Sequence, residues 1–384
     1  MIDAADELLL ARAVAAAERG LFSVTANPRV GCVLVRDQQV LGVGAHLAAG
    51  TPHAEVNALA AAREAAHSVA GATAYVSLEP CCHAGRTGAC TERLIDARIA
   101  RVVGAMRDPD PRVAGQGYAR LRSAGIAVDE TELAAARRLN HGHERRMRTG
   151  RPFVRVKVAQ SLDGRTAMAS GESKWITGAA ARREVQYWRA RSGAVLTGRG
   201  TVVADDPALT VRDPGAGAAP RQPLRVVLDS ALATPADAQL ATDGHPTLLA
   251  HGVGARTRPY ASQVSLLPCQ DERPDLAEVL DELGRRGCNE VLVEAGAELV
   301  GELLARELWD EMLVYVAPRW LGRSARPSAA FDVERLADAP GATLLGSAQV
   351  GDDTRIRLVR DPADSERVDD PPLGLAAFMA TDPN

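Results

Sequence analysis

The sequence predicts two consecutive α/β domains, and three observations support this prediction. The 384 residues are enough for two or three domains of about 150 residues each. Short apolar stretches suited to strands alternate with Ala- and Leu-rich stretches suited to helices in both halves. Residues 145–152 combine an arginine run with Gly150 and Pro152, as at a helix end followed by a linker. We therefore expect domains over residues 1–147 and 148–361, and a flexible Asp- and Pro-rich tail over 362–384.

The first half begins with a helix that we expect over residues 5–19, where an Ala- and Leu-rich stretch ends at Gly20. The apolar stretches that follow alternate between the lengths typical of strands and of helices. Strands are expected over residues 30–35, 40–46, 74–78, 102–105 and 126–128, and helices over 53–67, 90–97, 118–123 and 133–148.

The second half repeats this alternation and predicts a mostly parallel sheet. Residues 213–223 are rich in Gly, Pro and Ala and are expected to form a loop. Strands are expected over residues 153–158, 194–197, 224–228, 247–250, 291–293 and 312–316, and helices over 179–191, 275–286 and 297–308.

Composition excludes several classes of partner. The net charge is −4, from 45 basic and 49 acidic residues, and aromatic residues make up 3%. A nucleic-acid-binding protein should instead carry a basic surface with aromatic stacking residues. No apolar run approaches the roughly 20 residues of a membrane span, and residues 1–7 are acidic where a signal peptide would be basic. Six cysteines are too few for a disulfide scaffold. We expect a cytoplasmic protein with no membrane or nucleic-acid partner.

A separated group of His and Cys residues carries the strongest chemical signal. His53, Cys81 and Cys90 are the one-nitrogen, two-sulfur donor set of a catalytic zinc with an open fourth position. Glu55 stands two residues after His53, where it could move protons between a metal-bound water and a leaving amine. Zinc deaminases share the H-x-E…P-C-x-x-C signature, but here the second Cys follows nine positions after the first.

Two other interpretations of this group remain open. A closed structural zinc site would need a fourth protein ligand, which Cys82 or His83 could supply. His53 and the two cysteines could also be buried core residues without a metal. Determining whether a metal is bound, and by how many protein ligands, would distinguish these alternatives.

Motifs in both halves resemble the bifunctional riboflavin-biosynthesis deaminase/reductase family. In the first half these are 27–33 (NPRVGCV), 53–55 (HAE) and 78–90 (LEPCCHAGRTGAC), with the family's long Cys-to-Cys loop. In the second half they are 161–165 (SLDGR), 171–177 (GESKWIT), 205–212 (DDPALTVR) and 293–296 (VEAG). The chain departs from the family pattern at Ala26, Cys82 and Gly88-Ala89, but every metal ligand is present.

The resemblance implies a cytidine-deaminase-like three-layer domain followed by a dihydrofolate-reductase-like domain. The first would hydrolytically deaminate 2,5-diamino-6-(5-phosphoribosylamino)pyrimidin-4-one with one zinc per chain, and the second would reduce the ribosyl group to ribityl with NADPH. The partner is then a phosphorylated pyrimidine, and a homo-oligomer, either a dimer or a tetramer, is expected. The alternative function is a nucleic-acid-editing zinc deaminase with an appended binding domain.

The resemblance also implies roles for individual residues. No Gly-x-Gly-x-x-Gly fingerprint follows the first strand of the second half, so a standard Rossmann site is not expected. The turn at 294–299 joins a strand to a helix start, which suits a dinucleotide phosphate. Lys157 is a further polar group expected near the cofactor.

Arg189 and Arg212 are suited to a ribose phosphate, although either could instead form a surface salt bridge. Substrate contacts are expected at Asn27, Ser173, Arg189, Leu209, Arg212 and Glu294, and cofactor contacts at Ala159, Trp175, Thr201, Asp205, Ser230, Gly296, Ala297, Glu298, Leu299, Val300, Gly301 and Glu302.

Overall fold

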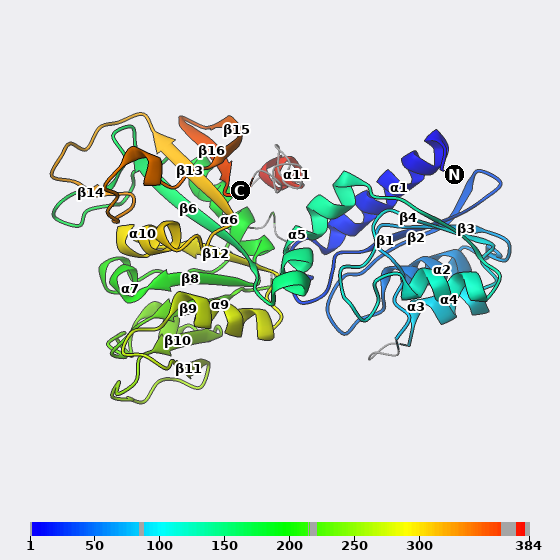
Figure 1. Ribbon diagram of the computed structural model, residues 1–384, viewed down its shortest axis with the longest axis horizontal. Helices are drawn as coiled ribbons and strands as arrows, with labels where there is room; N and C mark the ends of the chain where they lie inside the picture. Colours follow the sequence, from blue (N-terminus) through cyan, green and yellow to red (C-terminus); the bar gives the residue numbers. More distant parts are fainter. Residues whose placement is uncertain (1, 84–87, 214, 216–220, 362–373, 381–384) are drawn as a thin grey trace. The chain divides into compact units, whose positions relative to one another are not determined.

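The computed structural model describes residues 2–83, 88–213, 215, 221–361 and 374–380. The chain divides into two compact units, Met1–Thr149 and Gly150–Asn384 (Figure 1). Helix α5 (Ala134–Thr149) closes the first unit, so the arginine run that we placed at the boundary forms its last turn. Residues 84–87 of the predicted metal loop, and parts of the predicted loop at 213–223 and of the tail, lie outside the described residues.

The first unit is built on a five-stranded sheet with strand order β2-β1-β3-β4-β5. β1 runs antiparallel to β2 and β3, whereas β3, β4 and β5 are parallel. Figure 1 shows α2, α3 and α4 on one side of this sheet and α1 and α5 on the other. The strands are β1 (Gly31–Arg36), β2 (Gln39–Ala45), β3 (Thr73–Val76), β4 (Arg101–Gly104) and β5 (Ala127–Glu130), and the helices α1 (Ala4–Ala17), η1 (Glu18–Gly20), α2 (Ala54–Glu64), α3 (Cys90–Asp96), α4 (Gln116–Ser123) and α5.

Two local features of the first unit fix the position of its helices. Asp3 caps α1, since its Oδ1 accepts the Asp6 N–H at 2.8 Å and the Asp6 carboxylate accepts the Asp3 N–H at 3.2 Å. Gly44 of β2 lets α2 approach closely, because a Cβ there would collide with the carbonyl oxygen of Ala54. The N-terminal turn of α2 is therefore held against the end of β2.

The described residues of the second unit form a nine-stranded sheet with order β11-β10-β9-β8-β12-β6-β13-β16-β15. From β11 to β13 all neighbours are parallel, as predicted, and the last two pairings are antiparallel. The strands are β6 (Phe153–Ser161), β7 (Arg165–Ala167), β8 (Ala194–Gly198), β9 (Leu224–Leu228), β10 (Thr247–His251), β11 (Val264–Pro268), β12 (Glu290–Glu294), β13 (Glu311–Ala317), β14 (Arg326–Pro327), β15 (Thr343–Val350) and β16 (Asp353–Val359). The helices are α6 (Ala179–Arg191), α7 (Arg199–Asp205), α8 (Gln239–Thr242), α9 (Leu276–Arg285), α10 (Ala297–Ala305), η3 (Leu336–Asp338) and α11 (Leu375–Ala380).

Strand β16 was not predicted because its sequence contains charged residues that are in fact buried. Arg355 and Arg357 are 2% and 1% exposed. Arg355 donates to Glu184 at 2.7 Å and Arg357 to Glu311 at 2.8 Å, so both guanidinium groups are paired inside the unit. Their carboxylate partners lie far away in the sequence, and a reading of local hydrophobicity cannot detect such pairs.

Within the segment predicted as a tail, the described residues 375–380 form helix α11, which packs on α6. The Phe378 ring lies edge-on against Tyr187, with ring centroids 5.7 Å apart. Arg183 donates to the carbonyl oxygens of Phe378 and Met379 at 3.2 and 2.9 Å. A buried aromatic ring and a capped helix end hold this segment, even though the sequence before it is polar.

Among the helices described, none combines the length and the apolar character needed to cross a membrane.

Candidate active sites

Three elements of the first unit bring His53, Cys81 and Cys90 together. His53 is the N-cap residue of α2, Cys81 follows β3, and Cys90 opens α3. The Nδ1 atom of His53 lies 3.2 Å from Cys90 Sγ and 3.6 Å from Cys81 Sγ. Within the described residues this is the one group of at least three His, Cys, Asp or Glu side chains whose donor atoms all lie within 4.8 Å of one another.

The donor set fits a zinc ion. Zinc–nitrogen and zinc–sulfur bonds of about 2.0 and 2.3 Å in a tetrahedron place the two donors about 3.5 Å apart, close to the separations seen here. Hydrogen bonding from Cys90, and then from His53, lowers the pKa of Cys81 to about 4. The backbone N–H of Cys90 also points at Cys81 Sγ, at 3.4 Å. The site therefore already favours a thiolate, the form that binds metal.

Glu55 lies in the first turn of α2 and its side chain is buried, with 3% of the residue exposed. Burial, followed by the negative charge of Cys81, raises the pKa of Glu55 above its ordinary value. A carboxyl group with a raised pKa can both accept and return a proton near neutral pH. Its place beside the cysteines is the one that a proton-transfer group of a zinc deaminase needs.

Cys82 and His83 were the candidates for a fourth ligand. Cys82 Sγ is instead directed to the carbonyl oxygen of Arg112, at 4.0 Å, and it is not a member of the donor cluster. His83 is exposed. The described residues thus supply three ligands, the number expected at a catalytic zinc site.

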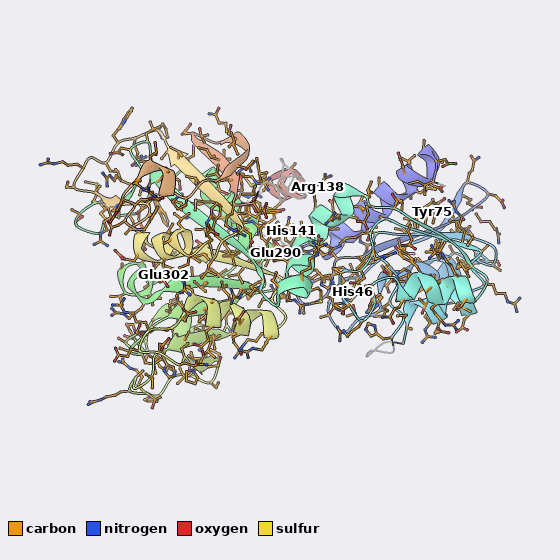
Figure 2. All side chains as sticks on the ribbon, viewed as in Figure 1. His46, Tyr75, Arg138, His141, Glu290 and Glu302 are labelled. Carbon is orange, nitrogen blue, oxygen red and sulfur yellow. The ribbon has the colours of Figure 1, made fainter. Side chains whose placement is uncertain are left out.

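His46, whose role the sequence did not indicate, links Asn27 to the metal ligands. Its Nε2 lies 3.0 Å from Asn27 Nδ2 and its Nδ1 lies 3.2 Å from the carbonyl oxygen of Pro52. The His46 ring, labelled in Figure 2, stands edge-on to that of His53 at 5.1 Å. Burial lowers the pKa of His46, so a neutral ring accepts from Asn27 and donates to Pro52.

Glu79 anchors the turn that carries Cys81. Its buried carboxylate accepts the backbone N–H groups of Asp108, Gly115, Gly117 and Tyr118 at 2.8–3.3 Å. Glu79 lies in the 78–90 motif, but nothing in its sequence context indicated its role. These contacts tie the Cys81 turn to the loop before α4 and to the start of that helix.

In the second unit, Arg189 of α6 and Glu294 of β12 form a two-point ion pair. Arg189 Nε and Nη2 lie 2.6 and 3.0 Å from the two carboxylate oxygens, and Nη1 donates to the carbonyl oxygen of Thr210 at 3.0 Å. The guanidinium of Arg189 is therefore already engaged. It holds Glu294 and the 209–212 segment in place, whereas Arg212 has no described side-chain partner.

Lys157 of β6 lies beside this pair. It is the register partner of Glu294 in the neighbouring parallel strand. Burial lowers the pKa of Lys157. Burial alone would raise the pKa of Glu294, but the charges of Arg189, Lys157 and Arg212 together lower it. The structure thus brings together Lys157, Arg189, Arg212 and Glu294.

Several other expected residues lie around the end of α7. Ser173 Oγ donates to Asp205 Oδ1 at 3.3 Å, and Lys174 Nζ donates to the Asp205 carbonyl oxygen at 3.2 Å. Leu209 is buried, with a left-handed φ of 52°. Trp175 is 62% exposed and stacks with Arg182, whose guanidinium carbon is 4.5 Å from the ring centroid.

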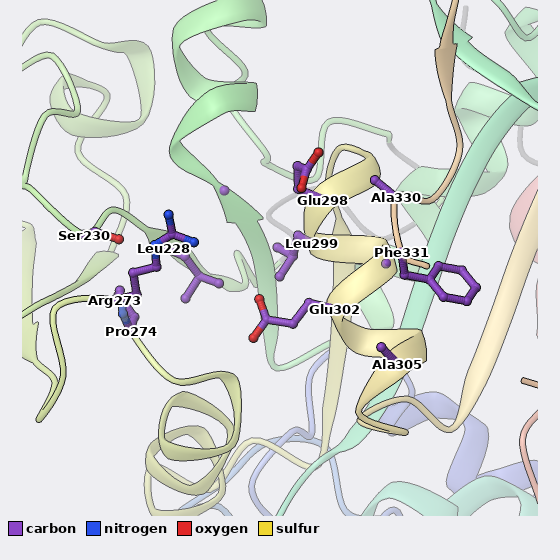
Figure 3. A pocket seen from close by; sticks show the side chains of 12 residues that line it. Leu228, Ser230, Arg273, Pro274, Glu298, Leu299, Glu302, Ala305, Ala330 and Phe331 are labelled. Carbon is purple, nitrogen blue, oxygen red and sulfur yellow. The ribbon is translucent and has the colours of Figure 1, made fainter. Parts of the chain in front are cut away.

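A pocket of about 350 Å³ gathers part of the expected cofactor set. Figure 3 shows Ser230 on one wall and Glu298, Leu299 and Glu302 of α10 on the other. Gly301 also lines it, together with two residues that the sequence analysis did not select, Arg273 and Phe331. Ala159, Trp175, Thr201, Asp205, Gly296, Ala297 and Val300 are not among the lining residues. The Val300 side chain is in the hydrophobic core, so only its backbone could contact a cofactor.

The pocket has the features of a dinucleotide site. It lies beyond the carboxyl ends of β8 and β9, where open α/β sheets bind ligands. Helix α10 starts at Gly296 with no side-chain cap, so its first N–H groups are available to a phosphate. These residues fit the NADPH that the sequence analysis predicted.

Comparisons with known proteins identify the family of both units. A family model described as the RibD C-terminal domain matches residues 152–356, and the cytidine and deoxycytidylate deaminase zinc-binding region matches residues 3–106. The riboflavin biosynthesis protein RibD of Escherichia coli K12 is 46% identical over 366 residues, which cover 92% of this chain and 99% of that protein. RibD of Haemophilus influenzae is 44% identical, covering 91% and 96%.

Solved structures give the same result for the fold. Acinetobacter baumannii RibD has a TM-score of 0.85 and 45% identity, covering 93% of this chain and 99% of that one. A Thermotoga maritima diaminohydroxyphosphoribosylaminopyrimidine deaminase/5-amino-6-(5-phosphoribosylamino)uracil reductase has a TM-score of 0.84 and 30% identity, with the same coverage. The predicted fold class and family resemblance are confirmed.

Proposed function

The chain belongs to the RibD family of bifunctional riboflavin biosynthesis enzymes, and we propose that its first unit carries the deaminase and its second the reductase. As a family member it is a zinc-dependent deaminase and an NADPH-dependent reductase of riboflavin biosynthesis. The division of labour is supported by the zinc-region match at residues 3–106 and the reductase-domain match at 152–356. The proposed substrate is the phosphoribosylated diaminopyrimidinone that the Thermotoga relative's description names.

The observation that carries the deaminase assignment is the buried Glu55 beside His53, Cys81 and Cys90. Zinc, when bound, supplies a water made acidic enough to act as a nucleophile near neutral pH. With zinc held by His53, Cys81 and Cys90, Glu55 would accept a proton from the attacking water and give one to the amine. The amine would leave the pyrimidine ring as ammonia, and a carbon–oxygen bond would replace the carbon–nitrogen bond. Asn27, oriented by His46, hydrogen-bonds the ring and fixes which carbon faces Glu55.

The reductase assignment is supported by the charged group around Glu294. NADPH, when bound, would supply a hydride to C1′ of the ribose, and the ribose oxygen that leaves C1′ would have to receive a proton. Lys157 is suited to give that proton, because its lowered pKa weakens its hold on it. Arg212 has no described side-chain partner and is the better candidate to bind the substrate phosphate. Arg189 acts as a positioning residue, since its guanidinium holds Glu294 and the Thr210 carbonyl.

Two features of the whole protein are also proposed. Six cysteines in 384 residues are too few for a disulfide scaffold, which supports a reducing cytoplasmic location. We propose a homo-oligomer, a dimer or a tetramer, and the exposed Trp320 and Leu336, 74% and 93% accessible, support a contact with a second copy. Light scattering on the pure protein measures the oligomeric state directly.

The test of the proposed function uses the zinc-loaded full chain and the diaminopyrimidinone substrate. Without NADPH, ammonia and the deaminated pyrimidine should form, and no NADPH-dependent product should appear. Adding NADPH should then convert the deaminated product to the ribityl compound. Absence of ammonia release from the zinc-loaded chain would contradict the deaminase assignment. Family membership sets aside the nucleic-acid-editing alternative.

A further inference from the structure

We propose that Arg273 binds the 2′-phosphate of NADPH and so makes this chain select NADPH over NADH. The inference rests on the proposed reductase function of the second unit and adds a specificity-determining residue to it. Its basis is the pocket of about 350 Å³, in which Arg273 is the one cationic lining residue among those described.

Arg273 is a guanidinium without a described hydrogen-bond or ion-pair partner. It is exposed, and the carboxylates that line the pocket do not contact it within ion-pair distance. By contrast, Arg306 is paired with Glu302 and Asp275 at 3.0 and 2.7 Å. An unpaired guanidinium in a pocket is available for a phosphate, to which it can donate two parallel hydrogen bonds.

The backbone around Arg273 is held in position. Pro274 restricts the preceding residue to extended conformations. Asp275 caps α9 by accepting the N–H groups of Ala277 and Glu278 at 2.8 and 3.1 Å. The same carboxylate pairs with Arg306, just after α10. Arg273 is therefore presented to the pocket from a segment tied to both α9 and the end of α10.

The charges of the pocket decide where a phosphate can lie. Glu298 and Glu302 stand on the α10 wall and disfavour an anion there, although Glu302 is partly neutralised by Arg306. Figure 3 shows Arg273 and Ser230 on the opposite wall. A hydroxyl and a guanidinium there can both donate to a phosphate. An additional phosphate on the nucleotide is therefore bound by the Arg273 wall.

The position along α10 distinguishes this subsite from that of the diphosphate. The diphosphate is expected at the uncapped N-terminus next to Gly296. The pocket lining runs from Glu298 to Ala305, which is roughly 10 Å of helix. A nucleotide anchored at Gly296 would thus place its adenosine end in the pocket. In dinucleotide sites an acidic residue at the ribose favours NADH and an arginine favours NADPH, so the Arg273 side determines the preference.

Calorimetric titration of the full chain with adenosine 2′,5′-bisphosphate and with 5′-AMP tests the inference without turnover. The wild type should bind the bisphosphate at least about tenfold more tightly than 5′-AMP. Arg273→Ala should weaken bisphosphate binding about tenfold to a hundredfold and leave 5′-AMP binding within about twofold. Arg256→Ala, which removes an exposed arginine outside the pocket lining, is the matched control and should retain the preference.

The other possible results of this titration distinguish a failure of the Arg273 inference from a failure of the proposed reductase function. Unchanged bisphosphate binding in Arg273→Ala overturns the inference but leaves the proposed reductase intact. If the wild type binds 5′-AMP more tightly than the bisphosphate, Glu298 and Glu302 recognise the ribose hydroxyls. That result also overturns the inference. Wild-type protein that binds neither NADPH nor the bisphosphate contradicts the proposed reductase itself. Retained 5′-AMP binding shows that Arg273→Ala is folded.

Discussion

The two sites differ in how their residues are distributed along the chain. His53 and Cys90, the outer metal ligands of the first site, are 37 positions apart, whereas Arg189 and Glu294 of the second are 105 apart. The first site consists of donor types that are rare elsewhere, held at two helix starts. The second consists of common charged residues that become a site only when helix α6, the 209–212 segment and the parallel strands β6 and β12 bring them together. A metal site can therefore be recognised from residue type and spacing, but a cofactor pocket depends on topology.

The largest effect is expected when a metal ligand of the first site is removed. Cys81→Ser should lose zinc and all measurable deaminase activity, because two protein ligands hold the ion too weakly. Reduction of supplied deaminated intermediate should remain. Metal analysis of the purified variants measures the effect, with Cys82→Ser as the matched control, expected to keep one zinc per chain. If Cys82→Ser also loses zinc, the ligand set is wrong and a structural zinc site gains support.

The next largest effect is expected for the proton-transfer group. Glu55→Gln should retain zinc and lose deaminase turnover by about 10²–10⁴-fold, because an amide cannot carry the proton. Ammonia release, with zinc content measured in parallel, checks this prediction. Glu64→Gln, an exposed glutamate of the same helix, is the control and should remain active. Deamination by Glu55→Gln within tenfold of the wild type would refute the role.

In the second unit, a smaller effect is expected because a single contact is lost. Arg212→Ala should reduce reductase kcat/KM by about tenfold to a hundredfold, which corresponds to one charge-assisted contact of roughly 1.5–3 kcal/mol. Oxidation of NADPH with deaminated substrate measures this. Arg256→Ala should have no effect. Equal activity of Arg212→Ala and the wild type would mean that the phosphate is bound elsewhere.

The smallest predicted effect concerns stability, away from both sites. Asp6 accepts from Arg101 and from Tyr75 (labelled in Figure 2), each at 2.8 Å, and Arg101 above all lowers the pKa of Asp6 from 3.8 to about 2. Because the folded pKa is the lower one, this stabilisation is present above pH 3.8 and disappears as the pH falls towards 2. Asp6→Asn should cost about 1–2 kcal/mol at neutral pH.

Acid titration of the unfolding free energy tests that prediction. In the wild type, the stability of the first unit should fall between pH 3.8 and 2 more steeply than in Asp6→Asn. Parallel curves for the two proteins over that interval would show that the ion pair contributes nothing measurable.

The sequence predicted more of the first site than of the second for physical reasons. His53, Glu55, Cys81 and Cys90 could be selected because zinc chemistry demands those side chains. His46 could not, because a histidine that orients Asn27 has no local pattern. Arg189 was expected to hold a phosphate, but only the fold shows that Glu294 and the Thr210 carbonyl already occupy its guanidinium. Arg273 was not predicted as a site residue, because nothing in its neighbouring sequence indicates a pocket.

In the fold as well, local features were predicted from the sequence and features that depend on distant residues were not. Strands with uninterrupted apolar stretches, such as β8 (Ala194–Gly198) and β10 (Thr247–His251), were predicted in place. Strand β16 was not, because Arg355 and Arg357 find carboxylates on α6 and β13. Helix α11 was not, because its stability depends on the Phe378 contact with Tyr187. Long-range pairing of this kind cannot be inferred from local periodicity.

If one chain holds two chemically separate sites, crossed half-reactions should show that each variant affects only one of them. Glu55→Gln and Arg212→Ala are each assayed for ammonia release from the diaminopyrimidinone and for NADPH oxidation with the deaminated intermediate. Glu55→Gln should lose only the first reaction, and Arg212→Ala should be weakened only in the second. A parallel loss of both activities in either folded variant would contradict the separation and show that the two sites are coupled.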